Sequence, residues 1–127
     1  MKTRARKTLH RGDPGAWAWV LHRISGAAIF FFLFAHVLDT VLLRVSPQAY
    51  DEVVEIYKTP LVGVLEAVLV AAVLYHAFNG IRVIVLDFWS QGQRYQRLTL
   101  WIAGIAWLAV MVPVLIVLGA RMVERFV

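Results

Sequence analysis

Three long apolar segments limit what this chain can fold into. They cover Ile24–Leu43, Leu61–Leu86 and Leu98–Leu118. Each is close to or above the ~20 residues that an α-helix needs to cross the ~30 Å hydrocarbon core of a bilayer. A soluble domain of 127 residues is not expected to be 61% hydrophobic and only 17% charged. The sequence therefore predicts an all-α membrane protein with three transmembrane helices, and any chemistry must take place in or against the membrane.

Proline-containing start signals predict where the helices begin. Asp13-Pro14 is typical of an N-cap followed by the first helical position, and Ser46-Pro47 predicts a short interfacial helix that ends before Pro60. We expect a basic N-terminal arm over residues 1–15 and a three-helix anchor domain over residues 16–127. The predicted spans are 22–44, 61–88 and 97–121.

The distribution of charge predicts the orientation of the chain. Six basic residues precede the first apolar segment: Lys2, Arg4, Arg6, Lys7, Arg11 and Arg23. The connection between the second and third segments carries Arg94 and Arg97, whereas the first connection carries three acidic residues. By the positive-inside rule, the N-terminus and the second connection are predicted to be cytoplasmic. Because the basic residues flank the apolar segments, we expect a lipid bilayer as partner and no nucleic acid.

The absence of cysteine narrows the possible chemistry. The chain has no cysteine, which excludes disulfides and cysteine-ligated iron–sulfur clusters on this chain. A cleaved signal peptide is not expected, because the first apolar segment is too long and is followed by Arg44.

His76 is an ionisable residue at mid-membrane depth. It precedes Asp87 by eleven residues, or ~16 Å along a helix, which is about halfway across the hydrocarbon core. A neutral imidazole at this depth fits two interpretations: a core residue bonded to a neighbouring helix, or an axial ligand to haem iron. Gly80, one turn further on, would leave room for a porphyrin against the same face.

The other ionisable residues inside the spans leave several interpretations open. His36 and Asp39 fit a structural pair, or a ligand with a carboxylate that orients it. Glu66 fits a surface position near the start of its helix. Asp39 and Glu66 together also suit a small proton-coupled transporter, because carboxylates inside a membrane are candidates for proton pathways.

Several polar residues are expected near the cytoplasmic ends of the first two spans. They are His22, Arg23, Ser25, Arg82 and Asp87. Cations and hydrogen-bonding groups at one interface can hold haem propionates or the carbonyl groups of a quinone. The alternative is ordinary anchoring of the spans by positive charge.

Two motifs carry a resemblance to a known family. His22-Arg23-Ile24-Ser25-Gly26 resembles the signature His-Arg-x-Ser-Gly of the cytochrome b membrane-anchor (C) subunits of succinate dehydrogenase, within the succinate:quinone oxidoreductases. His76-Ala77-Phe78-Asn79-Gly80-Ile81-Arg82 followed by Asp87 is similar to the family's His-x-x-x-Gly-x-Arg-x-x-x-x-Asp stretch. Both occur in the family's order and on the expected helices, and the three-span plan covers nearly the whole chain.

The resemblance implies a set of cofactors and partners. It implies haem b with His76 as axial ligand, the other ligand coming from a second membrane-anchor subunit that completes a haem-binding helical bundle. It implies His22, Arg23 and Arg82 near the propionates, and Trp19, Arg23, Ser25 and Asp87 at the quinone site. A flavoprotein and an iron–sulfur subunit would dock on the cytoplasmic side of a prokaryotic inner membrane. Electrons from succinate, an intermediate of the tricarboxylic acid cycle, would then reduce menaquinone or ubiquinone.

The sequence departs from the family pattern at two positions. Trp19 stands where well-studied members have a quinone-contacting serine, and Val83 stands where members with one haem often have a histidine. His36, in contrast, resembles the first-span ligand of members with two haems, so one or two haems are expected. A haem-free structural tether and a transporter remain the alternatives, and the direction of electron flow is left open.

Overall fold

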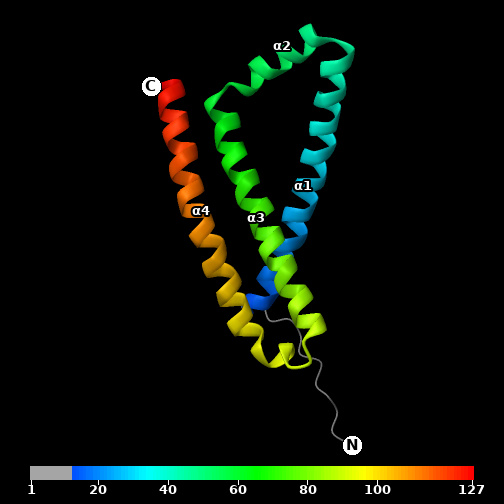
Figure 1. Ribbon diagram of the computed structural model, residues 1–127, viewed down its shortest axis with the longest axis vertical. Coiled ribbons are helices and arrows are strands. Elements are labelled where there is room, and N and C mark those ends of the chain that lie inside the picture. Colours follow the sequence, from blue (N-terminus) through cyan, green and yellow to red (C-terminus); the bar gives the residue numbers. More distant parts are fainter. Residues whose placement is uncertain (1–12) are drawn as a thin grey trace, which may run out of the picture.

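The computed structural model describes residues 13–127, and all of them but a few at connections and ends are helical. The predicted basic arm over 1–15 lies outside the described residues except for its last three positions. The elements are α1 (Pro14–Val45), α2 (Pro47–Tyr57), α3 (Pro60–Phe88), the 3₁₀ helix η1 (Gly92–Tyr95) and α4 (Gln96–Phe126). The start of α1 and the α3–α4 connection lie at one end of the molecule, and α2 and the C-terminus lie at the other (Figure 1).

Each of the first three helices begins at a capping side chain followed by proline. Asp13 Oδ1 accepts a hydrogen bond from Gly15 N at 3.1 Å. Ser46 caps α2 and Thr59 caps α3 through their side-chain oxygens in the same way. Such caps satisfy backbone N–H groups that have no partner inside the helix. The predicted helix starts at Pro14 and Pro47 are therefore confirmed, as is the end of the interfacial helix before Pro60.

α3 is the central helix and packs against both α1 and α4. Two aromatic side chains bond to backbone carbonyls across these contacts. Tyr75 OH on α3 donates to Ala18 O on α1 at 2.8 Å, and Trp107 Nε1 on α4 donates to Ala71 O on α3 at 3.0 Å. These bonds remove polar groups from the hydrocarbon, where an unsatisfied group is costly.

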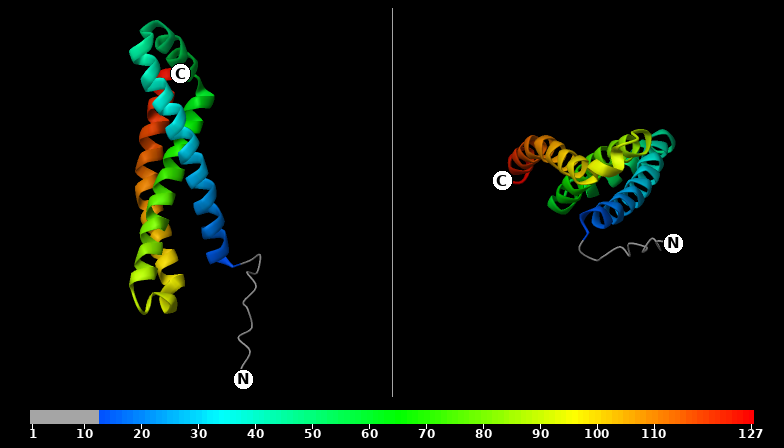
Figure 2. Two further views of the ribbon diagram at one scale, coloured as in Figure 1. Left: turned by 90° about the vertical axis from the view of Figure 1, so that its right-hand side faces the viewer. Right: turned by 90° about the horizontal axis from the view of Figure 1, so that it is seen from below.

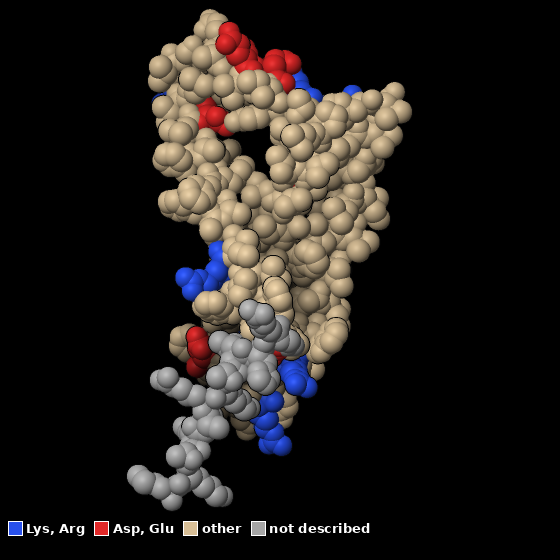
Figure 3. Space-filling view, turned by 180° about the vertical axis from the view of Figure 1, so that it is seen from behind, with Lys and Arg blue, Asp and Glu red and all other residues tan. Residues whose placement is uncertain are grey.

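α1 crosses α3 near the end that holds the α3–α4 connection and diverges from it toward α2 (Figures 1 and 2). An opening remains between α1 and α3 below α2 (Figure 3). α2 closes the far end of this opening, where Tyr57 OH donates to Asp39 Oδ2 on α1 at 2.9 Å.

The apolar surface is very large for a chain of this size. Three helices are long and apolar enough to cross a membrane. Within residues 13–127 the buried apolar side chains are Ala18 and Met111, whereas large ones such as Phe31 and Trp101 are about 70% exposed, at 68% and 71%. The charged side chains on the face seen in Figure 3 gather mostly toward the two ends of the molecule. The protein is therefore an all-α, multi-pass membrane protein whose apolar faces need lipid or partner subunits to cover them.

Candidate functional site

Two histidine rings lie stacked between α1 and α3. The rings of His22 and His76 have centroids 4.0 Å apart and planes inclined by 9°. Glycines make this close approach possible. A Cβ on Gly26 would lie 3.0 Å from His76 Cε1, and a Cβ on Gly80 would lie 3.7 Å from His22 Cε1. Gly80 was expected to leave room beside His76 for a porphyrin, and in this chain its open face receives the ring of His22.

Hydrogen bonds determine which nitrogen of His76 carries the proton. His76 Nδ1 lies 3.1 Å from His22 O and 3.2 Å from Ser25 Oγ. Ser25 Oγ in turn donates to His22 O at 2.9 Å. A carbonyl oxygen can only accept, and the serine proton is already used, so Nδ1 must be the donor. The second nitrogen, Nε2, therefore keeps its lone pair and has no hydrogen-bond partner among the described residues.

Arg82 is a cation inside the membrane-spanning part of α3 that has no carboxylate partner among the residues that the structure describes. Its Nη1 donates to Asn79 Oδ1 at 3.3 Å, and its Nη2 donates to Gln96 O at 3.4 Å. The ion pair found within residues 13–127 joins Lys58 and Glu55, far from this arginine in the sequence. Arg82 Nε and His22 Nδ1 are both buried without a hydrogen-bond partner in the described part of the chain.

These groups fit the haem that the sequence predicts. A neutral imidazole with a free Nε2 is a good ligand for haem iron and requires no buried charge. A guanidinium group without a counterion suits a propionate carboxylate, because a cation in a low-dielectric site needs an anionic partner. Buried polar atoms without a hydrogen-bond partner, such as His22 Nδ1, are rare in native protein structures and are expected where a ligand completes the site.

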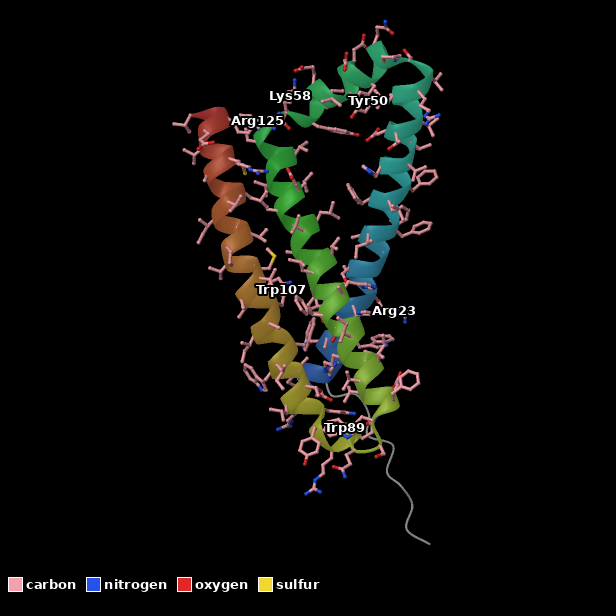
Figure 4. The ribbon with its side chains drawn as sticks, in the orientation of Figure 1. Arg23, Tyr50, Lys58, Trp89, Trp107 and Arg125 are labelled. Carbon is pink, nitrogen blue, oxygen red and sulfur yellow. The ribbon has the colours of Figure 1, made fainter. Side chains whose placement is uncertain are left out.

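The predicted quinone residues do not all meet within this chain. The Arg23 guanidinium lies over the Trp19 indole, 4.7 Å from the ring centroid. Arg23 points away from α3 (Figure 4), and Trp19 is exposed. Arg23 and Ser25 are two positions apart, so their side chains differ by about 200° in direction around the helix axis. Ser25 accordingly faces His76. Asp87 is exposed and makes no ion pair with Arg23.

His36 and Asp39 do not form the pair that their spacing suggested. The His36 ring is exposed and stacks on Phe32 with centroids 5.6 Å apart. Asp39 accepts its hydrogen bond from Tyr57 on α2. Glu66 is exposed near the start of α3, in line with a surface position.

A cavity that the sequence interpretation missed lies among α1, α3 and α4. Its volume is about 510 Å³. Its lining includes small residues on all three helices, Ala28, Ala71, Ala72, Ala103 and Gly104, and the aromatic residues Tyr75 and Trp107. The sequence feature that could have indicated this cavity is the presence of Tyr75 and Trp107, two aromatic residues with a polar group, inside apolar spans. The two stacked histidines do not line this cavity.

The sequence of this chain is similar to those of known membrane subunits. The family described as succinate dehydrogenase/fumarate reductase transmembrane subunit matches residues 2–112. The Mycobacterium tuberculosis protein described as succinate dehydrogenase 2 membrane subunit SdhC is 65% identical over 120 residues, 94% of this chain and 88% of that protein. A succinate dehydrogenase hydrophobic membrane anchor subunit of Archaeoglobus fulgidus is 39% identical over 55% of this chain and 60% of its own length. The subunit of the same description from Halobacterium salinarum is 31% identical over 59% of this chain and 58% of its own length.

Proposed function

The chain belongs to the succinate dehydrogenase/fumarate reductase transmembrane subunit family, and from this premise we propose that it ligates haem b through His76 and helps to form the quinone-reduction site. It is a membrane-anchor subunit of succinate dehydrogenase, an enzyme complex, and it crosses the membrane with three helices. In this proposal, succinate oxidation itself belongs to a flavoprotein subunit.

The two oxygen contacts of His76 Nδ1 are the observation that carries the haem proposal. His22 O and Ser25 Oγ hold the proton on Nδ1, so the lone pair of Nε2 is available to iron. When bound, haem b supplies one-electron transfer at mid-membrane depth. His76 would donate Nε2 to the iron, and Arg82 with His22 would hold the propionates. The second membrane-anchor subunit would supply a further ligand.

The Arg23–Trp19 pair supports a quinone site on the open face of α1. A guanidinium can donate to a quinone carbonyl, and an indole offers a flat surface for stacking. Because Arg23 points away from α3 and lies over the exposed Trp19 ring, the remaining walls would come from the second anchor subunit and the iron–sulfur subunit. Asp87 is placed at the rim of this site in our proposal, and the quinone is menaquinone or ubiquinone.

Visible spectra of the assembled complex test the haem proposal. The complex with its flavoprotein, iron–sulfur and second anchor subunits is purified as wild type, His76→Leu and His36→Leu. Reduced-minus-oxidised spectra of the wild type are expected to show haem b, and His76→Leu is expected to lose it because Leu has no lone pair for iron.

His36→Leu is the matched variant at a histidine of α1 that does not contact His76. If the complex holds one haem, the spectrum of His36→Leu equals that of the wild type. A partial loss of the haem signal in His36→Leu indicates a second haem at His36. A colourless wild-type complex, or a His76→Leu complex with full haem, would refute the role proposed for His76.

A further inference from the structure

We propose that Ser25 is a positioning residue for the haem ligand His76, and that it tunes the potential of the haem instead of contacting quinone. This inference rests on the proposed function, because it concerns the same histidine. It differs from the sequence-based expectation, which placed Ser25 at the quinone site.

The Ser25 hydroxyl lies at the contact between α1 and α3, and the residue also lines the cavity among α1, α3 and α4. The residue is 6% exposed, and its Oγ lies 3.2 Å from His76 Nδ1. Its proton goes to His22 O, so a lone pair of Oγ faces the N–H of His76. The carbonyl of His22 accepts from the same N–H at 3.1 Å. His76 therefore donates to two oxygens that both belong to one turn of α1.

The direction of the side chains separates Ser25 from the candidate quinone residues. Arg23 points away from α3 (Figure 4), whereas the Ser25 hydroxyl contacts a residue of α3. Positions two apart on a helix differ by about 200°, so one quinone headgroup on the outer face of α1 cannot reach both side chains. Ser25 therefore does not share the outer face of α1 with Arg23, and its hydroxyl contacts His76.

A hydrogen bond at Nδ1 changes how strongly the other nitrogen donates electrons. An acceptor that takes part of the N–H proton makes the imidazole a more basic ligand, which stabilises oxidised iron and lowers the reduction potential. Without the Ser25 oxygen, Nδ1 keeps only the carbonyl of His22. The ligand then donates less, and the potential of the haem rises.

Redox titration of the haem in the purified complex tests this inference. Ser25→Ala is expected to shift the midpoint potential of the haem to a more positive value, with KM for quinone as in the wild type. Ser25→Thr keeps a hydroxyl that can bond the carbonyl of the preceding turn, so it is expected to retain the wild-type potential.

Thr40 offers a matched control on the same helix. Thr40 Oγ1 donates to His36 O at 2.8 Å, which is the same kind of side-chain-to-backbone bond beside the other histidine of α1. Thr40→Ala removes a comparable hydroxyl far from His76 and is expected to leave the potential unchanged. If Ser25→Ala does not assemble, Ser25→Cys replaces the hydroxyl by a weaker acceptor and is expected to shift the potential in the same direction.

Several results would overturn the role of Ser25. The first is an unchanged or more negative midpoint potential in Ser25→Ala, or in Ser25→Cys where that variant is used. The second is a shift in Thr40→Ala equal to that in the Ser25 variant. The third is a raised KM for quinone in the Ser25 variant while its haem keeps the wild-type potential. The two proposals fail in different ways. A wild-type complex without haem refutes the ligand, whereas a haem that is lost in His76→Leu but unaffected by Ser25→Ala refutes only the positioning role.

Discussion

At the scale of single residues, the distance between α1 and α3 at the histidine pair depends on Gly26. The space that a side chain would occupy there is filled by the His76 ring, whose Cε1 lies 3.0 Å from the position of a Cβ. Gly104 on α4 is a useful contrast, because a Cβ there would meet nothing within 4 Å. The same substitution at these two glycines therefore separates the effect of contact from the effect of helix propensity.

Gly26→Ala is expected to displace His76 and to weaken haem binding. Overpacking typically costs ~1–3 kcal/mol, and Ala is favoured over Gly in a helix by ~1 kcal/mol, so the net loss is up to about 2 kcal/mol. The haem-to-protein ratio and the thermal midpoint of the purified complex should both fall. Gly104→Ala should keep full haem and an equal or higher midpoint. Full haem content in both variants would show that the approach of α1 to His76 tolerates a methyl group.

At the scale of elements, a side-chain hydrogen bond between described residues, from Tyr57 to Asp39, joins the end of α2 to α1. The hydrogen bond to the Asp39 carboxylate raises the pKa of the Tyr57 phenol above its ordinary value. A phenol with a raised pKa stays protonated at neutral pH, so Tyr57 continues to donate there. Its stabilising contribution is lost only when the pH rises through that raised pKa.

Tyr57→Phe is expected to loosen the end of α2 without affecting the haem. The lost bond is partly exposed and is worth at most about 1 kcal/mol, which corresponds to a roughly fivefold rise in local opening. Tryptic cleavage after Lys58 measures this opening directly. Tyr50 lies on the same helix and has no hydrogen bond to its hydroxyl among the described residues, so Tyr50→Phe is the control. Equal cleavage rates in the two variants would show that the Tyr57 bond does not hold α2.

Much of the element structure could be predicted from the sequence, and the contacts between elements could not. Helix starts are local: a capping residue before Pro14 or Pro47 satisfies free N–H groups within one turn. The bond from Ser25 to His76 joins residues 51 apart, and it depends on where two helices cross. Apolar spacing gives no crossing point in lipid, because lipid is as apolar as the side chains.

Depth along a helix does not by itself show which side chains belong to one site. Arg23 and Ser25 lie at nearly the same depth, and the sequence interpretation placed both beside quinone. Their directions around the helix axis differ by about 200°, which puts Arg23 on the outer face and Ser25 against His76. Depth sets the distance from the membrane surface, and direction decides which partner a side chain can meet.

At the scale of the whole molecule, the chain has almost no core of its own in residues 13–127. Large apolar side chains are exposed along all three spans. In the proposed function, lipid covers part of this surface and the second anchor subunit covers the rest. The proposal also docks the electron donor at the end of the molecule nearer to the histidine pair, which holds the α3–α4 connection (Figure 1).

The orientation of that end can be measured because the chain has no cysteine. Single cysteines at exposed positions, Gln48→Cys on α2 and Ser90→Cys after α3, can be treated with a membrane-impermeant maleimide in intact cells. Excess positive charge beside the first span and in the α3–α4 connection favours the cytoplasmic side for Ser90. Gln48→Cys should therefore react at once, and Ser90→Cys only after permeabilisation. The opposite pattern would place the histidine end outside the cell, away from a cytoplasmic electron donor, and would contradict the proposed path from succinate to quinone.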